Sequence, residues 1–214
     1  MTGKERFMKT LRFEEPDRPP HFESMFELER EAFGLQFPDR NSWAGCDGAP
    51  KQRQIAVCME IYQRIVETYH WDALAVYWPW SDPDGVAAAK RTFGERIAIG
   101  GMVSDGQLMP VLDQIMACRP HALQSIDPMA GMDIAVVKRL THGRMALMGN
   151  VQCNLLQDGP RAAIRRSTRY CLEHAAPGGG YIFSTSNTIF PGMPLANYEY
   201  MLEVFREYCQ ERTP

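Results

Sequence analysis

Acidic and imidazole side chains follow several short apolar runs of this 214-residue chain, at positions where they could move a proton. Glu23 comes two residues after His21, Asp105 lies in a Ser-Asp-Gly sequence, and Asp127 precedes Pro128. Residues two apart in a strand project to the same side, so His21 and Glu23 are expected to lie together. A carboxylate beside an imidazole suits acid–base chemistry or metal ligation. Glu23, Asp105 and Asp127 are therefore the candidate catalytic residues.

Each of these residues also has a structural interpretation. Asp127 could cap the turn or helix that follows it, because Asp side chains bond readily to nearby backbone N–H groups. Asp105 fits a turn equally well, since Ser-Asp-Gly is a good turn sequence. His21 and Glu23 could form a simple surface pair.

Polar and aromatic side chains recur at the ends of the expected strands. If these strands are parallel, their carboxyl ends gather at one rim, where loops carry the chemistry of barrel folds. Polar residues with aromatic walls suit an organic ligand better than a bare ion. The residues expected to bind a small-molecule substrate are His21, Trp78, Ser125, Asn150, Gln152, Ser184 and Asn187.

Helical and strand patterns alternate along the chain, which predicts an α/β fold with a parallel sheet covered by helices. Apolar residues at helical spacing predict a buried stripe on a helix from Ile55 to Tyr69. Asp158 is expected to cap a helix from Pro160 to His174, and Gly178 to Gly180 to end it. The expected strands lie at 19–24, 73–77, 96–101, 121–126, 145–148 and 181–183.

Several sequence runs resemble the uroporphyrinogen decarboxylase superfamily, near its methyltransferase-like branch. The run Glu15-Pro-Asp-Arg-Pro-Pro-His-Phe-Glu23 near the start of this chain resembles the opening of the family's sequences. The C-terminal part is similar in four runs: Leu123-Gln-Ser-Ile-Asp-Pro-Met-Ala-Gly-Met-Asp133, Met148-Gly-Asn-Val151, Ala176-Pro-Gly-Gly-Gly-Tyr181 and Pro194-Leu-Ala-Asn-Tyr198.

The resemblance implies a TIM barrel that is shortened in its middle. About a hundred residues of the family pattern are missing between Gly100 and Val103, which leaves about six strands in place of eight. Residues 1–214 are thus expected to form a single truncated domain. Open parallel edges need cover, so we expect either a tighter barrel or a homodimer.

The resemblance also bears on cofactors. The zinc-dependent methyltransferases of the superfamily serve corrinoid proteins and hold zinc with a His-x-Cys and a later Cys. Val103, Asp105 and Asn187 stand at the matching positions, so the usual zinc site is absent. A replacement zinc site would use Cys153 and His21 with Asp105, although Cys153 fits a packing role as well. Neither zinc nor a corrinoid cofactor is implied by the residues themselves.

Composition excludes several other classes of function. A net charge of -3 gives no basic surface for nucleic acid or an anionic membrane. Apolar runs are too short to cross a membrane, and the N-terminus lacks the apolar core of a signal peptide. Six scattered cysteines without CxxC pairs fit reduced thiols, so a cytoplasmic location is expected.

The sequence therefore leaves two functions open. One is an enzyme of decarboxylase or corrinoid-linked methyltransferase type, with a corrinoid protein as a partner if methyl transfer is retained. Uroporphyrinogen fits poorly, because the segment from His21 to Glu27 is acidic and would repel a polycarboxylate. The other is a catalytically inactive binding or assembly module, or a remnant of the family.

Overall fold

Parallel strands form two small sheets in this protein, for which we describe a computed structural model at residues 1–39, 42, 46–75, 91–92, 98–99, 106–117, 120–124 and 126–212. The junction at 100–103, where the family pattern is shortened, lies outside the described residues. The strands are β1 (Ala73–Leu74), β2 (Ala98–Ile99), β3 (Ala122–Leu123), β4 (Ala146–Val151) and β5 (Tyr181–Thr185).

The segment at Pro20 and His21, the expected first strand, is extended and links the two sheets. Phe183 N donates to Pro20 O at 2.8 Å, and Asp72 N donates to His21 O at 2.8 Å. The segment thus lies between β5 and β1, while β3, β4 and β5 pair in that order. All these pairings are parallel, which confirms the shortened, barrel-like α/β fold.

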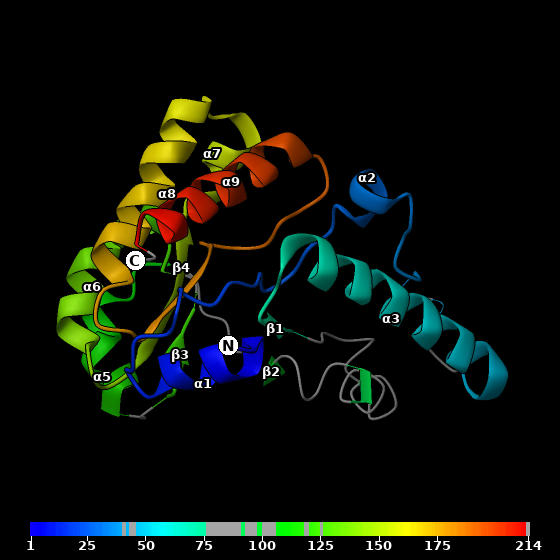
Figure 1. Ribbon diagram of the computed structural model, residues 1–214, viewed down its shortest axis with the longest axis horizontal. Coiled ribbons are helices and arrows are strands. Elements are labelled where there is room, and N and C mark those ends of the chain that lie inside the picture. The colour runs from blue at the N-terminus through cyan, green and yellow to red at the C-terminus, as the bar shows by residue number, and fades with distance from the viewer. Residues whose placement is uncertain are drawn as a thin grey trace.

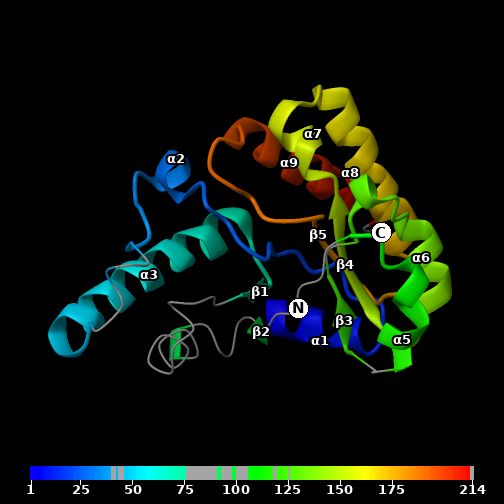
Figure 2. The same cartoon turned by 180° about the vertical axis from the view of Figure 1, so that it is seen from behind.

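Helices cover one side of the larger group of strands. Figure 1 shows α6, α8 and α9 against β4 and β5, and Figure 2 shows β3, β4 and β5 side by side from behind. The helices are α1 (Gly3–Leu11), α2 (Glu29–Phe33), α3 (Gly48–Tyr69), α5 (Leu112–Ala117), α6 (Ile134–Thr141), α7 (Cys153–Asp158), α8 (Arg161–Ala175) and α9 (Leu195–Glu211). None of the helices in the described ranges is long and apolar enough to cross a membrane.

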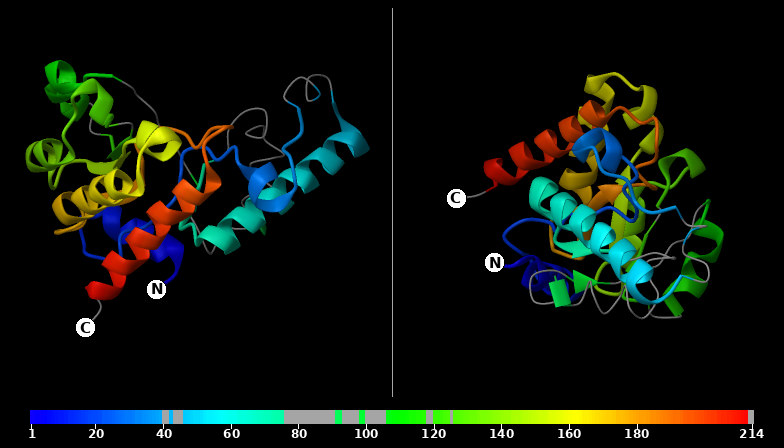
Figure 3. Two further views of the ribbon diagram at one scale, coloured as in Figure 1. Left: turned by 90° about the horizontal axis from the view of Figure 1, so that it is seen from above. Right: turned by 90° about the vertical axis from the view of Figure 1, so that its right-hand side faces the viewer.

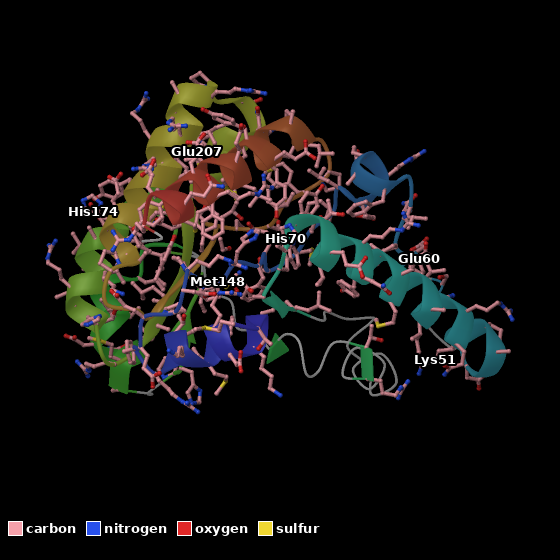
Figure 4. All side chains as sticks on the ribbon, in the orientation of Figure 1. Lys51, Glu60, His70, Met148, His174 and Glu207 are labelled. Carbon is pink, nitrogen blue, oxygen red and sulfur yellow. The ribbon has the colours of Figure 1, made fainter. Side chains whose placement is uncertain are left out.

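Helix α3 projects from the rest of the molecule (Figure 3). Figure 4 places His70 at the end of α3 next to the sheet, and Glu60 and Lys51 farther out. The predicted apolar stripe is confirmed, because Ile55, Cys58, Ile61, Tyr62, Ile65 and Tyr69 are buried.

A buried ionic network joins elements at the amino ends of the strands. The Asp72 carboxylate is 2% exposed and lies 2.5 Å from Arg6 Nη1 and 2.6 Å from Arg18 Nη1. His21 N also donates to Asp72 Oδ2 at 2.9 Å. The exposed Asp17 carboxylate binds Arg6 as well, at 2.6 Å. This network ties α1 and the first strand to the start of β1.

The three glycines after α8 pack closely against the N-terminal segment at Phe13 and Glu14. Gly178, Gly179 and Gly180 all have left-handed backbone, with φ of 77°, 69° and 65°. A Cβ on Gly179 would lie 2.6 Å from Glu14 O, and one on Gly180 would lie 2.6 Å from the Phe13 ring. Glycine is therefore required here by contact as well as by conformation.

Two details of the predicted helices and strands were wrong. Asp158 is the last residue of α7, an additional short helix, and Pro160 occupies the N-cap of α8. Strand β4 runs on to Val151, so Asn150 lies within the strand.

Lys138 is a buried cation whose titration should be visible in protein stability. It is 7% exposed and its ammonium group donates to Gly179 O. Burial lowers the pKa of Lys138 from 10.5 to about 8, although the Glu15 carboxylate opposes this shift. Between these values the unfolded chain binds more protons than the folded one, so stability rises with pH across this window.

We expect the free energy of unfolding to gain about 2 to 3 kcal/mol from Lys138 as the pH rises from about 8 to about 10. Urea unfolding of the wild type and Lys138→Met at several pH values measures the difference between the two slopes. Lys138→Met should lose this component while keeping a cooperative transition. Equal slopes in both proteins would show that Lys138 keeps its ordinary pKa.

Candidate functional site

Glu23 lies at the carboxyl end of the first strand, with three donors around one of its oxygens. Glu23 Oε2 is 3.0 Å from Ser184 Oγ, 3.0 Å from Thr185 N and 2.7 Å from Thr185 Oγ1. The side chain is fully buried, at 0% exposed. These contacts hold the carboxylate against the end of β5, and its other oxygen, Oε1, takes no part in them.

His21 faces that second oxygen of Glu23. His21 Nε2 lies 3.5 Å from Glu23 Oε1, which confirms that the two side chains share one side of the strand. Neither atom has a hydrogen-bond partner within the described part of the chain. The imidazole also packs beside the stacked rings of Phe183 and Phe205, at 5.6 Å and 5.8 Å between centroids. The pair is buried between the sheet and α9, which excludes the surface-pair alternative.

Cys153 is the first residue of α7 and lies near this pair. Its thiol is buried and lies 3.7 Å from Thr188 O. Burial raises the pKa of the Cys153 thiol, and the Glu23 charge raises it further, while hydrogen bonds from Ser186 and Thr185 oppose the shift.

The described residues do not assemble a metal site. Within them, no group of three or more His, Cys, Asp or Glu side chains is placed to hold a metal ion. Asn187 is exposed, and its side-chain oxygen accepts from Thr188 N at 2.8 Å. The donor set on these residues thus does not fit a thiolate-rich zinc centre, and we derive no step through zinc.

Two predicted substrate residues at the end of β4 have structural partners. The buried Asn150 side chain donates to Ile126 O at 2.8 Å and accepts from Cys171 Sγ at 3.1 Å. Gln152 is half-buried at the N-cap of α7, and its backbone N lies 3.4 Å from Ser167 Oγ. Their proposed contact with a substrate remains a prediction.

Asp127 occupies a capping position. Its side chain accepts from Met129 N at 3.0 Å, at the start of the 3₁₀ helix Pro128–Ala130. This is the structural alternative expected from the sequence, and a catalytic role for Asp127 stays a prediction. Of the other predicted site residues, Asp105, Trp78 and Ser125 lie outside the described residues.

Thr185 was missed by the sequence reasoning. In a regular strand, Ser184 and Thr185 point to opposite sides, so only one would reach Glu23. At this strand end, both hydroxyls and a backbone N–H converge on the same carboxylate oxygen. The signal that could have found Thr185 is the unbroken run of hydroxyl residues Ser184-Thr-Ser186.

Comparison with known proteins gives a family and a fold. Residues 85–208, more than half of the chain, match the family described as uroporphyrinogen decarboxylase (URO-D). No curated protein sequence matches the chain. Among solved structures, a methyltransferase from Methanosarcina mazei is similar, with a TM-score of 0.60 at 14% sequence identity. The similarity covers 97% of this chain and 99% of that one.

Proposed function

The chain belongs to the uroporphyrinogen decarboxylase family, and from this premise we propose that it is an enzyme that acts on a tetrapyrrole- or cobamide-related small molecule. The observation that carries this proposal is the buried His21–Glu23 pair, whose facing atoms lie 3.5 Å apart with no hydrogen-bond partner in the described part of the molecule. Unsatisfied buried polar atoms are costly and therefore suggest a functional role.

The pair is arranged to hold and move one proton. The three donors at Glu23 Oε2 fix the carboxylate, and the rings of Phe183 and Phe205 fix the imidazole. Oε1 and Nε2 remain as the two atoms that can exchange a proton with each other or with a bound molecule. The protonated pair could give its proton to the product carbon of a decarboxylation, and the pair without that proton could take one from a methyl acceptor and so activate it.

Of these two reactions, methyl transfer is favoured. The methyltransferase from Methanosarcina mazei shares the fold over nearly the whole chain, and the acidic segment from His21 to Glu27 would repel a polycarboxylate such as uroporphyrinogen. A corrinoid protein would be the methyl donor or acceptor. The lack of matching thiolate residues means that acceptor activation would rest on Glu23 and His21.

Turnover assays with methylcobalamin and a thiol acceptor, and with uroporphyrinogen, test the proposal directly. We expect demethylation of methylcobalamin, with Glu23→Gln lowering the rate about 100-fold because general acid–base groups contribute on this scale. Glu203→Gln changes an exposed carboxylate on α9 and is the matched control. Near-UV circular dichroism of each variant verifies that its packing is intact.

Two results would contradict this reading. If Glu23→Gln is as active as the wild type, Glu23 has no acid–base role. If the wild type neither binds nor turns over either compound, the proposed substrates are rejected. The second outcome would favour a binding or assembly module. That alternative has support in the structural contacts of Asn150 and Asp127, which are typical of packing and capping residues.

A further inference from the structure

A cavity of about 470 Å³ lies beside α2 and α3, at the exit of the first strand. Ser24 and Phe26 from the first strand's exit, Ala75 after β1, and Tyr62 from α3 are among its lining residues. Helix α2 packs against α3 here, as Figure 1 also shows. This volume is in the range of small-molecule sites in proteins.

The charge of the cavity wall is strongly acidic. Glu27, Glu29, Glu31 and Asp39 all line it, and among the described lining residues the one basic side chain is that of Arg30. Like charges gathered around one cavity favour a ligand of opposite sign. The acidic residues alone do not define a site, because solvated carboxylates are common at surfaces.

The burial of Glu29 distinguishes this cavity from an ordinary acidic surface. Its side chain is 7% exposed, and Oε1 accepts from Phe37 N at 3.3 Å. The second oxygen, Oε2, is buried and has no hydrogen-bond partner among the described residues. A buried carboxylate oxygen without a donor carries a large desolvation cost, which a ligand donor would offset.

The electrostatic surroundings of Glu29 agree with a missing cation. Burial raises the pKa of the Glu29 carboxyl, and the charges of Glu27 and Glu31 raise it further, while the backbone hydrogen bond from Phe37 opposes the shift. A positive group in the cavity would counter both of the causes that raise this pKa. Both causes that raise this pKa thus disfavour the charged carboxylate in the cavity as the described residues form it.

We propose that this cavity binds a small organic ammonium ion, with Glu29 as its ionic partner. Aromatic side chains of Phe26, Phe37, Tyr62 and Trp71 line the same cavity and suit an alkyl group attached to the cation. A bare metal ion fits less well, because it would need several convergent oxygen ligands. The site does not involve the His21–Glu23 pair, and the inference stands whether or not the proposed reaction is correct.

Isothermal titration of the whole chain with n-butylammonium, and with neutral n-butanol of similar shape, tests this inference. We expect the wild type to bind the ammonium and to bind the alcohol at least about tenfold more weakly, since a charged hydrogen bond is lost. Glu29→Gln should weaken ammonium binding by a similar factor. Glu203→Gln, an exposed carboxylate on α9, should leave it unchanged.

The inference is overturned if the wild type binds no ammonium, if the alcohol binds equally well, or if Glu29→Gln binds ammonium like the wild type. The comparison of the two ligands uses the wild type only, so it remains decisive even if Glu29→Gln does not fold. Methylcobalamin turnover is measured on the same samples. A wild type that turns over methylcobalamin but binds no ammonium would reject this site alone. A wild type that binds ammonium but does not turn over methylcobalamin would reject the proposed reaction alone.

Discussion

Replacement of Asp72 by alanine is expected to lower the free energy of unfolding by about 3 to 5 kcal/mol. The Asp72 carboxylate is 2% exposed and accepts hydrogen bonds from Arg6, Arg18 and His21 N. Removal of one partner from a buried ion pair leaves the other charge uncompensated. Here Arg6, itself 7% exposed, would lose its buried partner and keep the exposed Asp17 carboxylate as an ionic partner.

Urea unfolding of Asp72→Ala, followed by near-UV circular dichroism, measures this loss. Asp17→Ala is the matched control, because Asp17 binds the same Arg6 guanidinium but has 45% of its side chain exposed. Exposed ion pairs contribute little, so the control should lose no more than about 1 kcal/mol. Equal losses of unfolding free energy in the two variants would show that the burial of Asp72 does not strengthen its ion pairs.

Gly179→Ala is expected to destabilise the protein by about 2 to 5 kcal/mol, from left-handed backbone and from a direct clash. The new Cβ would lie 2.6 Å from Glu14 O and 2.9 Å from Glu14 C, which are backbone atoms and cannot rotate away. The N-terminal segment would have to move away from the loop. That movement would also disturb the hydrogen bond that Gly178 N donates to Glu15.

Gly34→Ala separates the two causes. Gly34 has a similar φ of 67°, but a Cβ there would meet nothing within 4 Å. This control should therefore show the conformational cost alone, about 1 to 2 kcal/mol. Thermal melts of both variants measure the difference. A Gly179→Ala protein as stable as Gly34→Ala would show that the new Cβ does not clash with Glu14.

Local sequence patterns were enough to predict most of the fold. Apolar residues at helical spacing predicted the buried face of α3, and alternation along a strand predicted that His21 and Glu23 would meet. These predictions succeeded because they depend on residues that are close in sequence. The strands that the structure describes pair in parallel, as the alternation of helices and strands had indicated.

Contacts between distant residues could not be predicted in this way. Asp72 lies 66 residues from Arg6 and 54 from Arg18, and nothing in its local sequence marks it as their shared partner. Asp127 shows a different limit, because an aspartate before proline suits a cap and a catalytic acid alike. The structure shows the capping bond to Met129 N. Glu29, which the sequence reasoning passed over, is distinguished only by its burial.

The position of the first strand determines when the sheet can be completed during synthesis. Pro20 and His21 leave the ribosome early, yet one of their two neighbours is Phe183 in β5. On that side, the first strand has no partner until most of the chain has been translated. The N-terminal segment therefore keeps an open backbone edge until β5 emerges, and only then can it link the two sheets.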